Sequence, residues 1–155
     1  MTERRRSTRT RRPLGTVLVQ VERQVARSLE AELIGDGFTL DQWRVLDLLA
    51  DGEGHPMSEI AAALVVPGPT LTKIIDKLVD SAVVYRLVDA RDRRRVLGFI
   101  SDHGYAVHER LAPRVDRAES DALATLGTDA PLLVELLARL ASATSLADGR
   151  LSTRD

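Results

Sequence analysis

Apolar residues recur every three or four positions through most of this 155-residue chain, and this period changes only once. Between residues 83 and 101 the helical spacing gives way to alternation around a polar, arginine-rich stretch. Spacing of three and four places side chains on one face of a helix, whereas alternation places them on one face of a strand. The chain is therefore predicted to be mainly α-helical, with one small β-hairpin set into the helical sequence.

The first helix is predicted for residues 14–33, where the apolar residues form one stripe. Leu14, Leu18, Val21 and Val25 are separated by three or four positions, and charged residues lie away from them. Two glycines that follow shortly afterwards end the helix. A single apolar stripe on a first helix needs a second apolar surface to cover it.

A second helix over residues 40–50 is followed by a short helix, a tight turn and a longer amphipathic helix. Ser58 is expected to cap the short helix, which runs to Leu64. Residues 67–69 read Pro-Gly-Pro and form the turn, and the longer helix ends at about Asp80. Its inward positions are Leu71, Ile74, Ile75 and Leu78. This order is typical of a helix-turn-helix, whose second helix enters the major groove of DNA.

The change of period predicts the hairpin. Residues 83–88 are rich in β-branched residues, and residues 95–101 alternate in polarity. The tip of the hairpin, residues 89–95, carries four arginines in five positions. Most charged turns are simply solvated, but arginines on a protruding ribbon suit the narrow minor groove of DNA. We expect Asp92 to orient the guanidinium of Arg94 through a charge-assisted hydrogen bond.

Two more helices complete the predicted chain. Ser101 and Asp102 are expected to cap a long helix, and Pro113 inside it is expected to bend it. The last helix opens within residues 128–131 and is rich in leucine. The two helices, like the first one, carry apolar residues that a partner surface must cover.

Composition narrows the possible functions. The formal net charge is only -1, but basic residues gather at positions 4–12 and 86–95, so one end of the molecule can still be positive. The absence of cysteine excludes disulfides, zinc–thiolate sites and catalytic thiols. Aromatic residues make up 3% of the chain, which requires an aliphatic core. No apolar run approaches the ~20 residues that cross a bilayer, so we expect a cytoplasmic protein that does not bind membranes.

Catalytic and metal-binding functions have little support in the sequence. Acidic residues do not share a recognisable catalytic spacing, and no glycine-rich phosphate loop or nucleophile elbow is present. His103 and His108 lie five residues apart, which is a poor spacing for one helix face. We therefore expect neither an enzyme nor a cofactor or metal site.

Residues 40–104 resemble the MarR family of winged helix-turn-helix regulators. The matching segments are 40–46 (LDQWRVL), 58–61 (SEIA) and 69–78 (PTLTKIIDKL), together with Asp89, Arg91, Asp92 and Arg94 of the hairpin and Ser101 and Gly104 after it. The flanking helices also fit the family, and the Asp-x-Arg-Asp-x-Arg hairpin is the most specific part. Two departures are Pro67, where the family has a polar helix cap, and Ala82, where it has glycine; we expect a differently shaped turn at Ala82.

The resemblance implies a winged helix-turn-helix joined to a helical dimerisation region. It implies a homodimer that regulates transcription, commonly as a repressor, on a pseudo-palindromic site in double-stranded DNA, with a small ligand that changes DNA affinity. The expected organisation is a disordered basic tail (1–13), an N-terminal dimerisation helix (14–36), the DNA-binding domain (37–101), C-terminal dimerisation helices (102–146) and a loose tail (147–155). The alternative is a winged-helix module that binds a protein and has no specific DNA site.

The expected site residues follow from this reading. DNA contacts are expected from Gly68, Pro69, Thr70, Thr72, Lys73, Lys77, Arg86, Arg91, Arg93 and Arg94, with Asp92 in support. Dimer contacts are expected from Leu14, Leu18, Val21, Val25, Leu133, Leu136, Leu137 and Leu140. Trp43 is expected in the core, where it could also line a ligand pocket.

Overall fold

The computed structural model describes the backbone of residues 12–151 and the side chains of residues 12–143. The chain divides into two compact units, residues 1–118 and 119–155. The predicted basic tail, residues 1–13, falls almost wholly outside the described part.

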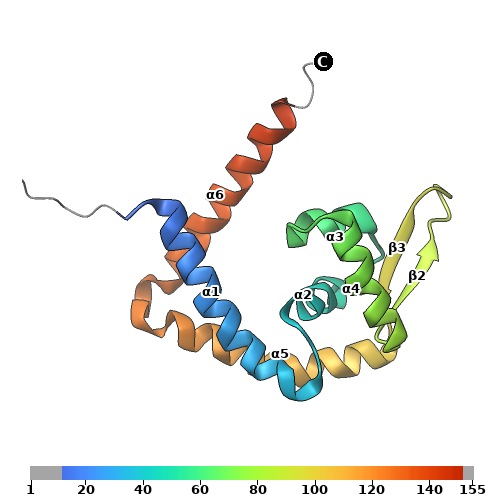
Figure 1. Ribbon diagram of the computed structural model, residues 1–155, viewed down its shortest axis with the longest axis horizontal. Coiled ribbons are helices and arrows are strands. Elements are labelled where there is room, and N and C mark those ends of the chain that lie inside the picture. The colour runs from blue at the N-terminus through green and yellow to red at the C-terminus, as the bar shows by residue number, and fades with distance from the viewer. Residues whose placement is uncertain (1–11, 152–155) are drawn as a thin grey trace, which may run out of the picture. The chain divides into compact units, whose positions relative to one another are not determined.

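The first unit is a bundle of helices with a small sheet at one side (Figure 1). Its helices are α1 (Leu14–Leu33), α2 (Leu40–Leu48), α3 (Met57–Leu64), α4 (Gly68–Asp80) and most of α5 (Asp102–Leu123). Two short 3-10 helices follow α1 and α2: η1 (Ile34–Asp36) and η2 (Leu49–Asp51). The strands are β1 (His55–Pro56), β2 (Val84–Val88) and β3 (Val96–Ile100). The predicted mainly α-helical fold with a winged helix-turn-helix is thereby confirmed.

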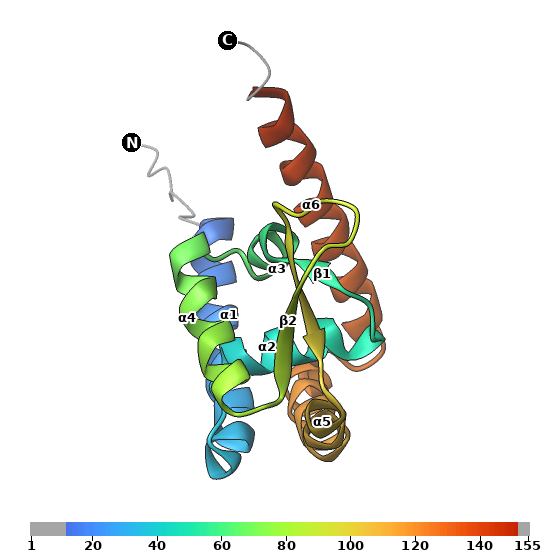
Figure 2. The same cartoon turned by 90° about the vertical axis from the view of Figure 1, so that its right-hand side faces the viewer.

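The three strands form an antiparallel sheet in the order β1-β3-β2. In the predicted hairpin Val84 pairs with Ile100 and Val88 with Val96, and its tip projects away from the helices beside α4 (Figures 1 and 2). The sequence did not predict β1, because two residues are too few to show an alternating pattern. It pairs His55 with Gly98 and so anchors the hairpin to the segment before α3.

The core of the first unit is aliphatic, as the scarcity of aromatic residues predicted, and Trp43 of α2 is buried within it. Leu29 and Leu33 of α1 and Leu111 of α5 belong to the same buried cluster. The compact unit is therefore wider than the predicted 37–101 domain, because the flanking helices supply part of its core.

Two helix starts differ from the prediction or add to it. The predicted cap at Ser58 is wrong: α3 begins at Met57 after Pro56, whose φ of -58° already suits a helix start. At α2 the sequence missed a capping box, in which the Thr39 hydroxyl accepts the N–H of Gln42 at 3.2 Å and the Gln42 side chain accepts the N–H of Thr39 at 2.9 Å.

The turn after α4 keeps the left-handed backbone that glycine would supply, with φ of 56° at Ala82. The expectation of a differently shaped turn is therefore wrong. A side chain in this region of φ costs free energy that glycine does not. The hydrogen bonds around the turn hold it in place, since the N–H of Ser101 donates to Val83 and the Ser101 hydroxyl donates to the Ala82 carbonyl.

We expect Ala82→Gly to stabilise the protein by about 1 kcal/mol, because the strained conformation becomes an ordinary one. Urea denaturation followed by circular dichroism measures the change. Ala63→Gly is the matched control: Ala63 is exposed in α3 at an ordinary helical φ, so the same substitution there should cost about 1 kcal/mol. Equal losses at both positions would contradict the account.

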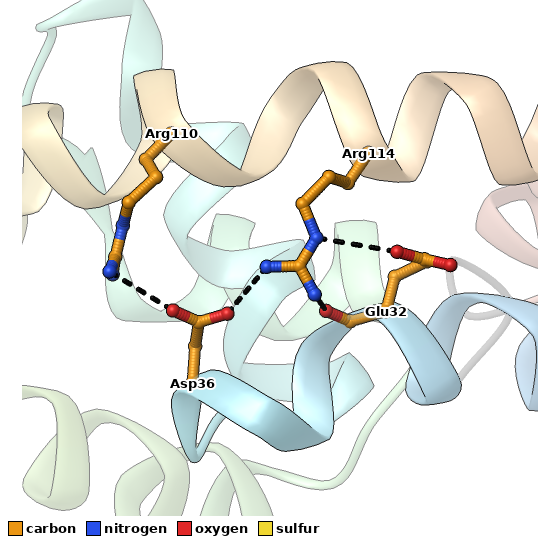
Figure 3. A network of polar contacts seen from close by, with 4 residues as sticks. All are labelled: Glu32, Asp36, Arg110 and Arg114. Carbon is orange, nitrogen blue, oxygen red and sulfur yellow. Dashed lines mark hydrogen bonds and ion pairs between the residues drawn. The ribbon is translucent and has the colours of Figure 1, made fainter.

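An ion-pair network joins α1 and η1 to α5 (Figure 3). Arg114 donates to the Glu32 carboxylate at 3.3 Å, to the backbone oxygen of Glu32, and to Asp36 at 2.6 Å. Asp36 also meets Arg110 at 3.0 Å, so one carboxylate receives two guanidinium groups. Hydrogen bonds to Asp36 and Glu32 raise the pKa of Arg114.

We expect Asp36→Asn to lower the melting temperature by about 2–5 °C, because two arginines lose one charged partner at a partly buried position. Scanning calorimetry measures the shift. Asp116→Asn, which removes an exposed carboxylate from α5, serves as the control and should change the melting temperature by less than about 1 °C. A shift of the same size in the control would show that total charge, and not the network, is responsible.

The second unit contains the end of α5, the 3-10 helix η3 (Ala124–Asp129) and α6 (Ala130–Leu151). Helix α6 carries exposed apolar side chains, among them Leu136 and Leu140. It continues through Ala147, where the sequence predicted a loose tail, because that segment contains no proline to stop a helix.

Across residues 12–151, no single helix is long and apolar enough to span a bilayer. The consecutive helices α3 and α4 reach the required length and composition only when taken together, and they are bent by 106° where they join.

Candidate nucleic-acid interface

The second helix of the helix-turn-helix, α4, divides into a buried and an exposed face as the sequence predicted. Leu71, Ile75 and Leu78 are buried against the core. The exposed side holds Gly68, Pro69, Thr70, Thr72, Lys73, Asp76 and Lys77. The face that packing leaves free thus carries hydroxyl and ammonium groups, which can meet base edges and phosphates.

The first turn of α4 starts without a side-chain cap. The N-cap residue is Pro67, and its carbonyl oxygen accepts the N–H groups of Thr70 and Leu71, each at 3.0 Å. The Thr72 hydroxyl donates to the carbonyl oxygen of Gly68 at 3.1 Å, so its proton is used within the helix. Thr72 can therefore offer its hydroxyl oxygen to DNA as an acceptor, whereas Thr70 and Lys73 can still donate.

Two aspartates build the hairpin tip by the same local contact. Asp89 Oδ1 accepts the backbone N–H of Arg91 at 2.8 Å, and Asp92 Oδ1 accepts that of Arg94 at 3.0 Å. Each Asp-x-Arg segment is therefore an Asx turn. The expectation that Asp92 holds the guanidinium of Arg94 is wrong, because the carboxylate binds the Arg94 main chain and leaves its side chain free.

The arginines at the tip differ in what holds them. Arg95 pairs with Glu59 of α3 at 3.4 Å, which ties the base of the turn to the helix-turn-helix. Arg91, Arg93 and Arg94 are exposed and make no ion pair with any side chain that the structure describes. Unpaired guanidinium groups on a projecting tip keep their full charge for an external anion such as a phosphate.

Arg86 differs from the other basic residues of the predicted interface. It lies on β2, and its guanidinium contacts Asp76 of α4 at 2.6 Å and the carbonyl oxygen of Thr72 at 3.5 Å. From the sequence we expect Arg86 to contact DNA, like Lys73 and Lys77. The structure instead directs its side chain to the neighbouring helix, a contact between residues ten and fourteen positions apart that periodicity could not reveal.

A cavity of about 270 Å³ lies beside the end of α4. Its walls come from the loop before α2, the turn after α4 and the first half of α5; they include Phe38, Ser81 and Arg110. Trp43, the predicted pocket residue, does not line it. Its ring is stacked on that of His108 with centroids 5.0 Å apart, and His108 bonds Asp47 at 2.9 Å.

The histidines do not assemble a metal site within the described part of the chain. His55 bonds Asp51 at 2.8 Å, and no group of three or more histidine, aspartate or glutamate residues there has the geometry to hold a metal ion. The N–H of Glu53, which donates to Asp51, holds the pKa of that carboxyl below its ordinary value.

The chain is similar to known regulators in sequence and in structure. A family profile described as "MarR family" matches residues 36–95. The HTH-type transcriptional regulator FarR of Neisseria gonorrhoeae is 29% identical over 125 residues, which cover 80% of this chain and 86% of that protein.

Solved structures that match most of this chain include two with informative contents. A MarR variant from Escherichia coli complexed with operator DNA has a TM-score of 0.74 and 26% identity, over 84% of this chain and 93% of that chain. NadR in complex with 4-hydroxyphenylacetate has a TM-score of 0.75 and 26% identity, over 91% of this chain and 98% of that chain.

Proposed function

Because this chain belongs to the MarR family of winged helix-turn-helix transcription regulators, we propose that it is a homodimeric repressor of cytoplasmic location. It binds a pseudo-palindromic operator, and a small molecule changes its affinity for DNA. The exposed face of α4 enters the major groove of each half-site, and the arginines of the β2–β3 tip reach the adjacent minor groove.

The observation that carries this proposal is the set of unpaired basic side chains on α4 and the tip. Lys73 and Lys77 lie on the exposed face of the helix, and Arg91, Arg93 and Arg94 at the tip form no ion pair within the described part of the chain. Each guanidinium or ammonium that neutralises a phosphate releases condensed counterions, which makes binding salt-dependent. Gly68, Pro69 and Thr70 are at the end of α4 that precedes these lysines, where close approach to bases requires small side chains.

Fluorescence anisotropy of the full chain with a duplex that it selects from a random pool tests the proposal. We expect tight binding that weakens with salt. The logarithm of the association constant should fall linearly with the logarithm of the salt concentration, with a slope of about -0.9 for each neutralised phosphate. A random duplex of equal length should bind far more weakly. A protein that selects no sequence, or that binds without salt dependence, would point to the alternative of a winged-helix module for protein partners.

The exposed apolar residues of α1 support the homodimer. Leu14, Leu18 and Val21 are 61%, 37% and 47% exposed, on the stripe that continues into the buried Leu29. Exposed leucines and a valine in one stripe are typical of a surface that another chain covers. We propose that this stripe packs in the dimer together with α6, whose contributing residues are Leu133, Leu136, Leu137 and Leu140.

We expect Val21→Glu to raise the dimer dissociation constant about 30-fold, equivalent to about 2 kcal/mol, because a carboxylate would be buried without a partner. Analytical ultracentrifugation measures it. Val19→Glu is the matched control, because Val19 is 51% exposed but points away from the stripe. Dissociation by both variants, or by neither, would refute the assigned interface.

Regulation by a small molecule rests on the likeness to NadR, whose structure contains 4-hydroxyphenylacetate. Hydroxylated aromatic acids are therefore the compounds to test first. Trp43 is the one tryptophan of the chain, so its fluorescence reports changes around the ring that it stacks on. A compound that lowers DNA affinity and shifts this emission would support the proposal, and a panel that changes neither would favour a repressor without an effector.

A further inference from the structure

Asp76 occupies an unexpected place for a carboxylate on a DNA-facing helix. It is 51% exposed and lies between Lys73 and Lys77 in sequence, on the side of α4 that packing leaves free. A negative charge beside the phosphate backbone opposes binding. We therefore expect Asp76 to make a favourable interaction within the protein that offsets this repulsion.

The contact that Asp76 makes crosses from the recognition helix to the wing. Arg86 Nη2 donates to Asp76 Oδ1 at 2.6 Å and to the Thr72 carbonyl oxygen at 3.5 Å. One nitrogen of a strand residue thus meets a side chain and the main chain of α4, one helical turn apart. A guanidinium shared in this way fixes both the rotation and the position of the helix relative to β2.

The Arg86 side chain is held by its terminal nitrogen alone. Its Nε is buried and has no hydrogen-bond partner among the described atoms. An unpaired buried donor is unfavourable, so the fold keeps this placement in spite of that penalty. The Arg86 side chain is 31% exposed, which leaves it less available to DNA than the exposed tip arginines.

We propose that Asp76 and Arg86 act together as positioning residues: they set the angle of α4 against the wing, and sequence discrimination depends on that angle. This inference rests on the proposed DNA-binding function. Neither side chain reads a base. Asp76 holds Arg86 on the helix, and Arg86 neutralises the carboxylate that would otherwise repel the phosphates.

The opposite role for Arg86 is a direct phosphate contact, as the sequence suggested. In that role Asp76 competes with DNA for the guanidinium. The two roles predict opposite effects of Asp76→Asn. Removal of a competing negative charge should tighten binding, whereas loss of the positioning contact should weaken binding to the selected duplex even though a repulsive charge has gone.

The experiment measures anisotropy of full-length variants with the duplex selected by the wild-type protein and with a random duplex, at several salt concentrations. We expect Asp76→Asn to lose about tenfold in affinity for the selected duplex and to bind the random duplex at least as tightly as wild type. Arg86→Met should lose specificity to a similar extent, with an unchanged salt slope, and the double variant should be no worse than either single one.

Asp80→Asn is the matched control, because Asp80 is an exposed carboxylate of the same helix that pairs with no side chain among the described residues. This substitution removes the same charge and should slightly raise the affinity for both duplexes. The melting temperature of each variant is measured as well, so that affinities are compared only between folded proteins. Arg86→Lys should not restore specificity, because a lysine lacks the fixed fork of donors.

Tighter binding of both duplexes by Asp76→Asn would overturn the inference. A salt slope that falls by about one unit in Arg86→Met would overturn it too, because that is the signature of one lost phosphate contact. Either result would leave the proposed function intact. Failure of the wild-type protein to select any duplex would overturn the proposed function, and the inference with it.

Discussion

Arg94→Ala is expected to weaken binding to the selected duplex by about 5- to 150-fold, equivalent to about 1–3 kcal/mol. The Arg94 guanidinium is free of ion pairs within the described chain, while Asp92 holds its main chain at the tip. Its charge is therefore available to DNA and contributes little to folding. Removal should lower affinity at an unchanged melting temperature.

Anisotropy titrations and a thermal melt of the same preparation measure the two quantities. Arg117→Ala is the control, since Arg117 is an exposed arginine of α5 for which the structure shows no partner. It removes one positive charge away from the tip and should change affinity by less than about twofold. An Arg94 variant that binds like wild type, or a control that loses as much, would refute the role of the tip.

Substitutions of Asp92 test whether the Asx turn at the tip is needed for the Arg94 side chain to contact DNA. In Asp92→Asn an amide oxygen can still accept the Arg94 N–H, so the Asx turn should persist and affinity should change little. Asp92→Ala removes the acceptor and should resemble Arg94→Ala, although every arginine remains.

Gly104→Ala is expected to destabilise the protein by about 3 kcal/mol. A Cβ at this position would overlap the carbonyl oxygen of Val83 and lie 2.7 Å from Cγ1 of Ile100. The first neighbour is backbone and cannot rotate away. The first turn of α5 packs directly on the segment after α4, so any relief moves one of these two elements.

Chemical denaturation of Gly104→Ala and Gly35→Ala measures the difference. At Gly35 an added Cβ meets nothing within 4 Å, and alanine suits a helical turn better than glycine. The control should be neutral or slightly stabilising. A Gly104 variant as stable as wild type would mean that α5 can shift without loss, and the close packing at Val83 would not be essential.

Periodicity predicted the fold well because the helices and the hairpin are long enough for their patterns to repeat. The stripe from Leu71 to Leu78 fixed which face of α4 is buried, and therefore which residues are exposed. The same reasoning could not find β1, which has two residues. It also misplaced the start of α3, because Ser58 is a good cap by type, but Pro56 holds the N-cap position and the helix begins at Met57.

Side-chain partners were beyond the reach of the sequence. Arg114 lies 78 and 82 residues from Asp36 and Glu32, and no local pattern pairs them. At Asp92 the residue type allowed two partners within reach, the guanidinium and the N–H of Arg94. The turn geometry chose the N–H. The sequence does not distinguish Arg86 from the other basic residues of the predicted DNA interface, because its partner Asp76 comes next to it only in the folded chain.

The shared core also limits how such regulators can exchange parts. Leu29, Leu33 and Leu111 are buried with the residues that support α4, although they come from outside residues 37–101. Recombination that transferred only that segment would remove these residues from the buried cluster that also contains Leu71 and Ile75 of the recognition helix. Substitution of exposed residues on α4 and the tip should therefore change the preferred operator with less loss of stability than transfer of residues 37–101 as a block.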